Sequence, residues 1–140
     1  MKSKKLINNY YGFEYIDVEV PIRTEIVGKE EIEVIDMDIA DIEKMVARTI
    51  IEEKIPIRGR EVKFLRKVLG LSMEKFARNF DFSSAAILKW EKEDDKRLSL
   101  VNELAVRTFI NDMLEFELDV KFFDLNARST LPKKVIKLAA

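Results

Sequence analysis

Residues 69–91, LGLSMEKFARNFDFSSAAILKWE, constrain the fold of this chain more than any other segment. They predict two short helices joined by a tight turn, which is the spacing of a helix-turn-helix motif. The small side chain of Ala77 leaves room for the second helix to cross closely, and Asp81 stands at the turn. Apolar Phe76 falls in the first helix, and the residues expected to face inward are Phe82, Ile87 and Trp90. The alternative is an ordinary helical hairpin with a core of its own.

The other side of the second helix is then free to contact DNA. The residues predicted there are Ser83, Ser84, Ala85, Leu88 and Lys89. Lys89 is interpreted as a base or phosphate contact, with plain solvation as the alternative, whereas for Ala85 a thymine-methyl contact and simple helix preference stay equally open. Trp90 is interpreted as a core residue and not as a base-stacking platform. Ser72 and Ser83 stand at helix starts, where backbone N–H groups can bind phosphate.

The net charge of -1 hides an asymmetry along the chain. Residues 1–57 carry 8 basic and 13 acidic side chains, whereas residues 58–97 carry 11 basic and 7 acidic ones. Residues 98–140 carry 6 of each. The basic excess therefore coincides with the helix-turn-helix segment, where contacts to phosphates need positive charge. A chance fluctuation among solvated charges is the alternative.

Composition excludes several kinds of site. The 140 residues contain no cysteine and no histidine, which excludes disulfides, thiolate metal sites and an imidazole base. We expect no cofactor, no metal site and no enzymatic activity, because paired carboxylates such as Asp94 and Asp95 are explained as solvated loop residues. No apolar run approaches the roughly 20 residues of a membrane span, and the N-terminus lacks a signal-peptide core. A cytoplasmic protein outside the membrane is expected.

Residues 13–36 have the alternating pattern of a β-hairpin. The side chains predicted on its buried face are Ile16, Val18, Val20 and Ile22, and those on the opposite face are Asp17, Glu19 and Arg23. Pro21 also falls on the outward face and predicts an edge strand. Alternation at Phe116, Leu118, Val120 and Phe122 predicts a second, C-terminal strand.

Helical periodicity and capping residues fill the middle of the chain. Besides the two helices after Ser72 and Ser83, helices are expected at about residues 38–53, 60–69 and 98–114. Gly70 fits the left-handed position just past a helix end. The whole pattern predicts an α+β fold, mainly α, in three parts: residues 1–57 as a hairpin and helix for partner binding or dimerisation, 58–114 as a DNA-binding domain, and 115–140 as a strand and tail.

Residues 59–97 resemble the Cro/lambda-repressor-like helix-turn-helix family, also called the xenobiotic-response-element family. The resemblance is carried by LRKVLGLS at 65–72, FA at 76–77 and ILKWE at 87–91. It implies five short helices that bind operator DNA as a dimer, with Ser84, Ala85 and Lys89 entering the groove. Met73 departs from the glutamine that the family favours as a phosphate contact, and Asp81 replaces the usual turn glycine. Glu91 is expected to pair with a basic residue such as Arg66.

The layout of a hairpin, a helix, a short linker and then GREVKFLRKVLGLS also resembles bacterial antitoxins of the MqsA and HigA kind. MqsA-like proteins often hold zinc through paired cysteines, so without cysteine the N-terminal part here is expected to fold without metal. This resemblance implies an autoregulating repressor and a cognate toxin as partner. The acidic residues Glu30, Glu31 and Glu33 are candidates for docking a basic toxin.

The function predicted from these features is a sequence-specific DNA-binding repressor, the antitoxin of a toxin-antitoxin pair. The alternative is a protein-interaction module without DNA binding. The expected partners are double-stranded DNA with a palindromic operator, a second copy of the chain and a toxin. For the dimer contact we favour the strand at residues 116–122, with the hairpin edge and the helix at residues 98–114 as alternatives.

Overall fold

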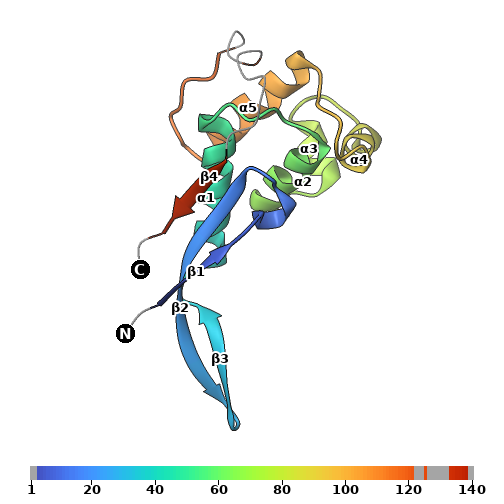
Figure 1. Ribbon diagram of the computed structural model, residues 1–140. Coiled ribbons are helices and arrows are strands. Elements are labelled where there is room, and N and C mark those ends of the chain that lie inside the picture. Colours follow the sequence, from blue (N-terminus) through green and yellow to red (C-terminus); the bar gives the residue numbers. More distant parts are fainter. Residues whose placement is uncertain (1–2, 122–124, 126–132, 139–140) are drawn as a thin grey trace. The chain divides into compact units, whose positions relative to one another are not determined.

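The computed structural model describes residues 3–121, 125 and 133–138, and it combines a β-sheet with α-helices (Figure 1). The predicted α+β class, mainly α, is confirmed. The chain forms two compact units, one made of residues 1–46 and 131–140 and the other of residues 47–130. This division differs from the predicted boundary near residue 57, because the connector at residues 54–59 lies inside the second unit with Ile55 and Ile57 fully buried.

In the first unit, β2 is the central strand of a four-stranded sheet. It pairs with β1 and β3 in antiparallel and with β4 in parallel orientation. The β2–β3 pair turns at Gly28, whose φ of 64° suits glycine, so the predicted hairpin is confirmed. Its predicted inward residues are buried: Ile16, Val18, Val20 and Ile22. The strands are β1 (Ser3–Ile7), β2 (Ile16–Val27), β3 (Glu30–Ile35) and β4 (Lys134–Lys137), with a short 3-10 turn, η1 (Tyr10–Gly12), between β1 and β2.

Pro21 lies in the central strand, so its predicted edge position was wrong. Its side chain is buried, and it faces Lys4 of β1 across the ladder. On the other side of β2, the pairing with β4 ends at Glu19 and the pairing with β3 starts at Ile22. The carbonyl of Pro21 accepts a hydrogen bond from the Asp36 amide at 2.8 Å. Pro21 thus lies in the gap between the β4 pairing and the β3 pairing. Proline is accommodated there because no strand partner on that side needs its missing N–H.

Asp17 was expected on a solvated face, and it is buried. Its carboxylate accepts a hydrogen bond from the Asn9 amide at 3.0 Å and pairs with the Lys133 ammonium at 3.0 Å. These two contacts, the backbone bond first, lower the pKa of the Asp17 carboxyl below its usual value. The stabilisation they provide is therefore present at neutral pH and is lost as the pH falls through this lowered pKa.

The helices follow the predicted pattern closely. Asp38 caps the first of them by accepting the Ala40 amide at 3.0 Å, and Ser99 caps the last by accepting the Asn102 amide at 3.2 Å. Gly70 has a φ of 68° just past the second helix, as predicted. The helices are α1 (Ile39–Glu52), α2 (Gly59–Val68), α3 (Met73–Arg78), α4 (Ser84–Lys92) and α5 (Leu100–Met113).

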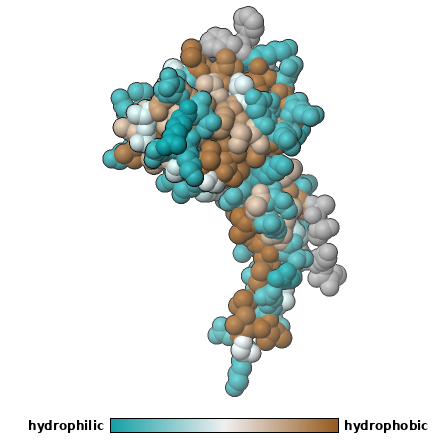
Figure 2. Space-filling view, turned by 180° about the vertical axis from the view of Figure 1, so that it is seen from behind, coloured by the Kyte–Doolittle hydropathy of each residue, from teal (hydrophilic) through white to brown (hydrophobic). Residues whose placement is uncertain are grey.

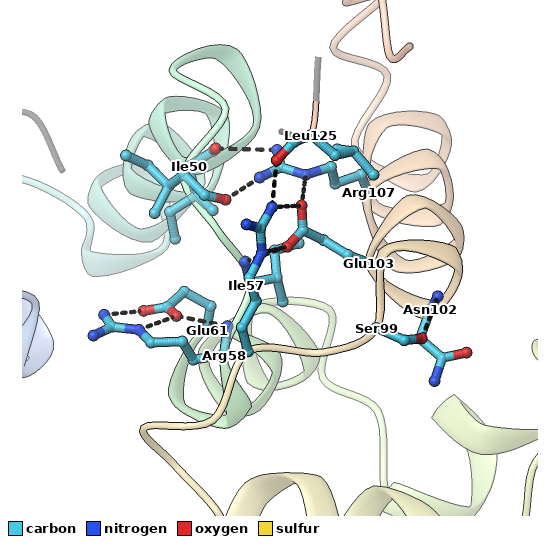
Figure 3. A network of polar contacts seen from close by, with 11 residues as sticks. Ile50, Ile57, Arg58, Glu61, Ser99, Asn102, Glu103, Arg107 and Leu125 are labelled. Carbon is cyan, nitrogen blue, oxygen red and sulfur yellow. Dashed lines mark hydrogen bonds and ion pairs between the residues drawn. The ribbon is translucent and has the colours of Figure 1, made fainter. Parts of the chain in front are cut away.

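A buried polar network holds the second unit together (Figure 3). Glu103 of α5 is fully buried and accepts from the Ile57 amide at 2.9 Å, from Arg97 Nε at 2.7 Å and from Arg107 Nε at 3.2 Å. Arg107 also donates to the carbonyl groups of Ile50, Ile51 and Ile55. The Ile50 and Ile51 carbonyls lie in the last turn of α1, and the Ile55 carbonyl lies in the connector after it. One arginine of α5 therefore joins α5 to the end of α1 and to that connector.

The prediction of a strand at residues 116–122 was wrong for residues 116–121, which form no strand. Residue 122 lies outside the described residues. Glu115 and Glu117 have positive φ values of 54° and 56°, which no strand allows. The Asn111 side chain donates to the Leu118 carbonyl and accepts from its amide, both at 3.0 Å. A side chain thus occupies the backbone groups that a strand partner would need. The C-terminal strand is β4 instead.

Within residues 3–121, 125 and 133–138, every helix is too short or too polar to cross a bilayer.

Candidate nucleic-acid interface

The helix-turn-helix geometry arises from local signals around α3 and α4. Ser72 Oγ accepts the Lys75 amide at 3.1 Å, and Ser83 Oγ accepts the Ala86 amide at 3.2 Å. Each serine therefore caps the helix that follows it, as predicted. Between the helices, Asp81 has a φ of 58°, a left-handed conformation that aspartate tolerates better than most residues. Two caps and one left-handed residue produce the tight turn.

The inward side of α4 rests on fully buried Ile87. Ala77 of α3 is also buried, and its carbonyl accepts from the Phe82 amide at 3.0 Å across the turn. Phe76 is buried beside Phe80 and Phe109, with ring centroids 5.0 and 5.9 Å away. The predicted inward position of Ile87 is confirmed, and the burial of Ala77 agrees with the close helix crossing expected there.

Phe82 and Trp90 are less buried than predicted. Phe82 is 36% exposed. Phe80 packs in the position expected for Phe82, and the ring centroid of Phe80 lies 5.2 Å from that of Phe109. The left-handed Asp81 between them redirects the chain, so the first phenylalanine meets the core and the second lies at its margin. Phe82 packs edge-to-face on half-buried Trp90 at 5.4 Å. Trp90 is therefore a marginal core residue, and truncating it costs less than the about 3–5 kcal/mol of a fully buried tryptophan.

The outward side of α4 is a continuous exposed face, hereafter the α4 face. It consists of Ser84, Ala85, Leu88, Lys89 and Lys92, all of them exposed. At 3.6 residues per turn these positions span an arc of about 140°. Four of the six predicted site residues lie on this face, whereas Ser72 and Ser83 are exposed at the starts of α3 and α4. Lys92 was missed, although it lies one turn beyond Leu88 on the same side.

Two interactions fix the orientation of α4. Arg66 of α2 forms a bidentate ion pair with Glu91, with Nε–Oε2 and Nη2–Oε1 distances of 2.7 and 2.9 Å, as predicted. Arg66 also donates to the Leu71 carbonyl at 2.9 Å, so one guanidinium joins α2, the loop before α3, and α4. At the other end of α2, Gly59 lies directly against the carbonyl of Trp90. Sequence reasoning missed this close approach, because nothing local to Gly59 indicates it.

The α4 face carries two lysines and no acidic residue. The negative charge on α4 is confined to Glu91, which Arg66 neutralises on the other side. One serine hydroxyl, an alanine and a leucine complete the surface, which offers donors, an acceptor and apolar contact in one strip. Such a surface is suited to the edges of bases and to phosphates.

Comparison with protein families, with curated proteins and with solved structures finds no match to this chain.

Proposed function

We propose that the chain is a sequence-specific DNA-binding regulator of transcription, a repressor that inserts α4 into the major groove. The observation that carries this proposal is the division of α4 into a buried side, anchored by Ile87 and Glu91, and the exposed α4 face. An α-helix with its side chains is about 10–12 Å across, so α4 fits a major groove about 12 Å wide. Ser83, at the start of α4, leaves first-turn amides directed toward a phosphate.

Lys89→Ala is expected to weaken binding to the operator by about 1–3 kcal/mol, because Lys89 is an exposed cation of the α4 face. The side chain is exposed, so the melting temperature should stay at the wild-type value. Fluorescence anisotropy with a labelled operator duplex and with a random duplex measures the effect. Lys63→Ala, an exposed lysine of α2, is the matched control and should bind both duplexes as the wild type does.

The two duplexes separate the possible roles of Lys89. A loss confined to the operator supports base contact. Equal loss on both duplexes means that Lys89 contacts phosphate only, and unchanged binding on both removes it from the interface.

The same proposal includes a two-fold dimer that binds a palindromic operator. One α4 face offers too few contacts to select a site in a genome, and symmetric pairing doubles them. The recognition helices are then expected to engage half-sites about 34–36 Å apart. Residues 116–121 form no strand, so α5, with exposed Val101 and Met113, replaces the strand as the C-terminal candidate for the contact. Light scattering at tens of micromolar should give twice the chain mass, and a monomer that footprints a single half-site would contradict the dimer.

A second function, capture of a basic protein such as a cognate toxin, is supported by the β2–β3 hairpin. Three apolar side chains at its end are exposed: Ile26 by 73%, Val27 by 58% and Ile32 by 41%. Figure 2 shows apolar patches among hydrophilic side chains along this hairpin. This end of the hairpin carries four acidic residues, Glu25, Glu30, Glu31 and Glu33, and two basic ones, Arg23 on β2 and Lys29 in the turn. This acidic and apolar surface repels DNA and complements a basic protein.

Co-expression with the product of a neighbouring reading frame tests the second function. If the hairpin is the contact, Ile26→Ser should lose co-purification of that product, and Ile39→Ser, an exposed apolar residue of α1, should retain it. Loss in both variants, or in neither, would exclude the hairpin as the docking surface.

A further inference from the structure

A cleft of about 400 Å³ opens at the C-terminal end of α4. Seven residues line it: Lys89, Trp90, Glu93, Lys96, Arg97, Leu98 and Ser99. All of them belong to the unit of residues 47–130. The volume lies within the range of about 300–1,000 Å³ that is typical of small-molecule sites. Lys89 and Trp90 of α4 form one side of the cleft, and Lys89 also belongs to the α4 face. The other five lining residues come from the segment that joins α4 to α5.

The lining combines one aromatic wall with an excess of positive charge. Trp90 and Leu98 supply the apolar surface. Three cations face one carboxylate, and that carboxylate, Glu93, lies 3.7 Å from the Lys96 ammonium. Arg97 is held by Glu103 at 2.7 Å. The Lys89 ammonium has no hydrogen-bond or ion-pair partner among the described residues, so it is available to a ligand.

We propose that this cleft binds a small aromatic carboxylate that acts as an effector. The ring would lie against Trp90 and Leu98, and the carboxylate would pair with Lys89 and Lys96. An occupied cleft engages Lys89, which the α4 face needs for DNA, so the ligand should weaken DNA binding. The binding site stands on the cleft alone, whereas the regulatory effect rests on the proposed DNA-binding function.

Trp90 is the only tryptophan of the chain, so its emission reports directly on the cleft. Phenylacetate is expected to change the emission of the full-length protein saturably, with a Kd of about 1 mM. Benzyl alcohol supplies the ring without the charge, and inorganic phosphate supplies charge without the ring. Both should bind at least tenfold more weakly.

Two lysine variants test the position of the carboxylate. Lys96→Gln and Lys89→Gln should each weaken phenylacetate binding by at least fivefold. Lys63→Gln, on α2 and outside the cleft, should leave it unchanged. Equal binding of benzyl alcohol, unchanged binding in both cleft variants or the absence of a saturable emission change would overturn the site. If inorganic phosphate binds as tightly as phenylacetate, the cleft is a binding site for DNA phosphates and not an effector site.

Anisotropy with an operator duplex at constant ionic strength tests the coupling. Saturating phenylacetate should weaken DNA binding about tenfold in the wild type and not in Lys89→Gln. An unchanged DNA affinity with the cleft occupied would overturn the regulatory role. A protein that binds no DNA would refute the proposed function, while the emission titration would still decide whether the cleft takes an aromatic carboxylate.

Discussion

Gly59→Ala is expected to destabilise the helical unit by about 3 kcal/mol or more, although glycine to alanine normally favours a helix. A Cβ at this position would lie 1.9 Å from the Trp90 carbonyl oxygen and 2.9 Å from that of Glu93. Both contacts are to backbone, so no side-chain rotation relieves them. The start of α2 is also hydrogen-bonded to the segment after α4, with the Gly59 amide 3.2 Å from the Lys96 carbonyl and the Arg60 amide 3.1 Å from that of Asp94.

Gly70→Ala is the control for this prediction. A Cβ there meets nothing within 4 Å, and only the strain of a φ of 68° remains, about 1–2 kcal/mol. Urea denaturation followed by circular dichroism gives both free energies of unfolding. A Gly59→Ala variant at least as stable as Gly70→Ala would show that α2 and α4 do not approach as closely as described.

Glu103→Ala is expected to lower the free energy of unfolding by about 3–5 kcal/mol, because removing one partner leaves buried charge uncompensated. The variant leaves the Arg107 guanidinium, which is 2% exposed, without its carboxylate partner. It also removes the acceptor of the Ile57 amide. Arg97 loses its carboxylate partner as well. The whole network that holds the end of α1 to α5 should therefore weaken.

Glu74→Ala on α3 is a closely matched control. Glu74 pairs with Arg78 at the same i,i+4 spacing as Glu103 and Arg107, but its side chain is 68% exposed. An exposed pair of this kind contributes about 0.3–0.5 kcal/mol. A similar small loss in Glu103→Ala, measured by the same urea titration, would contradict the buried network.

The features predicted correctly from the sequence are those with a local cause. The serine caps at residues 72, 83 and 99 act on amides three residues away, and Gly70 and Asp81 adopt left-handed conformations by their own chemistry. The exposed side of α4 followed from helical periodicity. The Arg66–Glu91 pair spans 25 residues, and it was predicted because the resemblance to the helix-turn-helix family supplied the pairing.

The missed features depend on segments that meet only after folding. The role of Glu103 needs Ile57, which is 46 residues away in the sequence, and the tight position of Gly59 needs the backbone of Trp90. Asp17 is buried because the distant Lys133 pairs with it. Alternation alone indicated a strand at residues 116–121, but the side chain of Asn111 binds the Leu118 backbone and prevents one.

For the candidate site, the sequence was sufficient to predict which residues of α4 are exposed. It was insufficient for the aromatic residues at the margin, Phe82 and Trp90, whose burial depends on how the chain leaves Asp81. The cleft at the end of α4 was also missed, since it forms between α4 and a loop whose path no local pattern specifies.

The most direct test of the central claim, that the α4 face recognises a DNA sequence, is selection of duplexes by the wild-type protein from a random pool at fixed salt. The account predicts one enriched palindromic motif, bound at least about 10³-fold more tightly than a shuffled duplex of the same composition. Enrichment of no motif, with selected and shuffled duplexes bound equally or not at all, would contradict it.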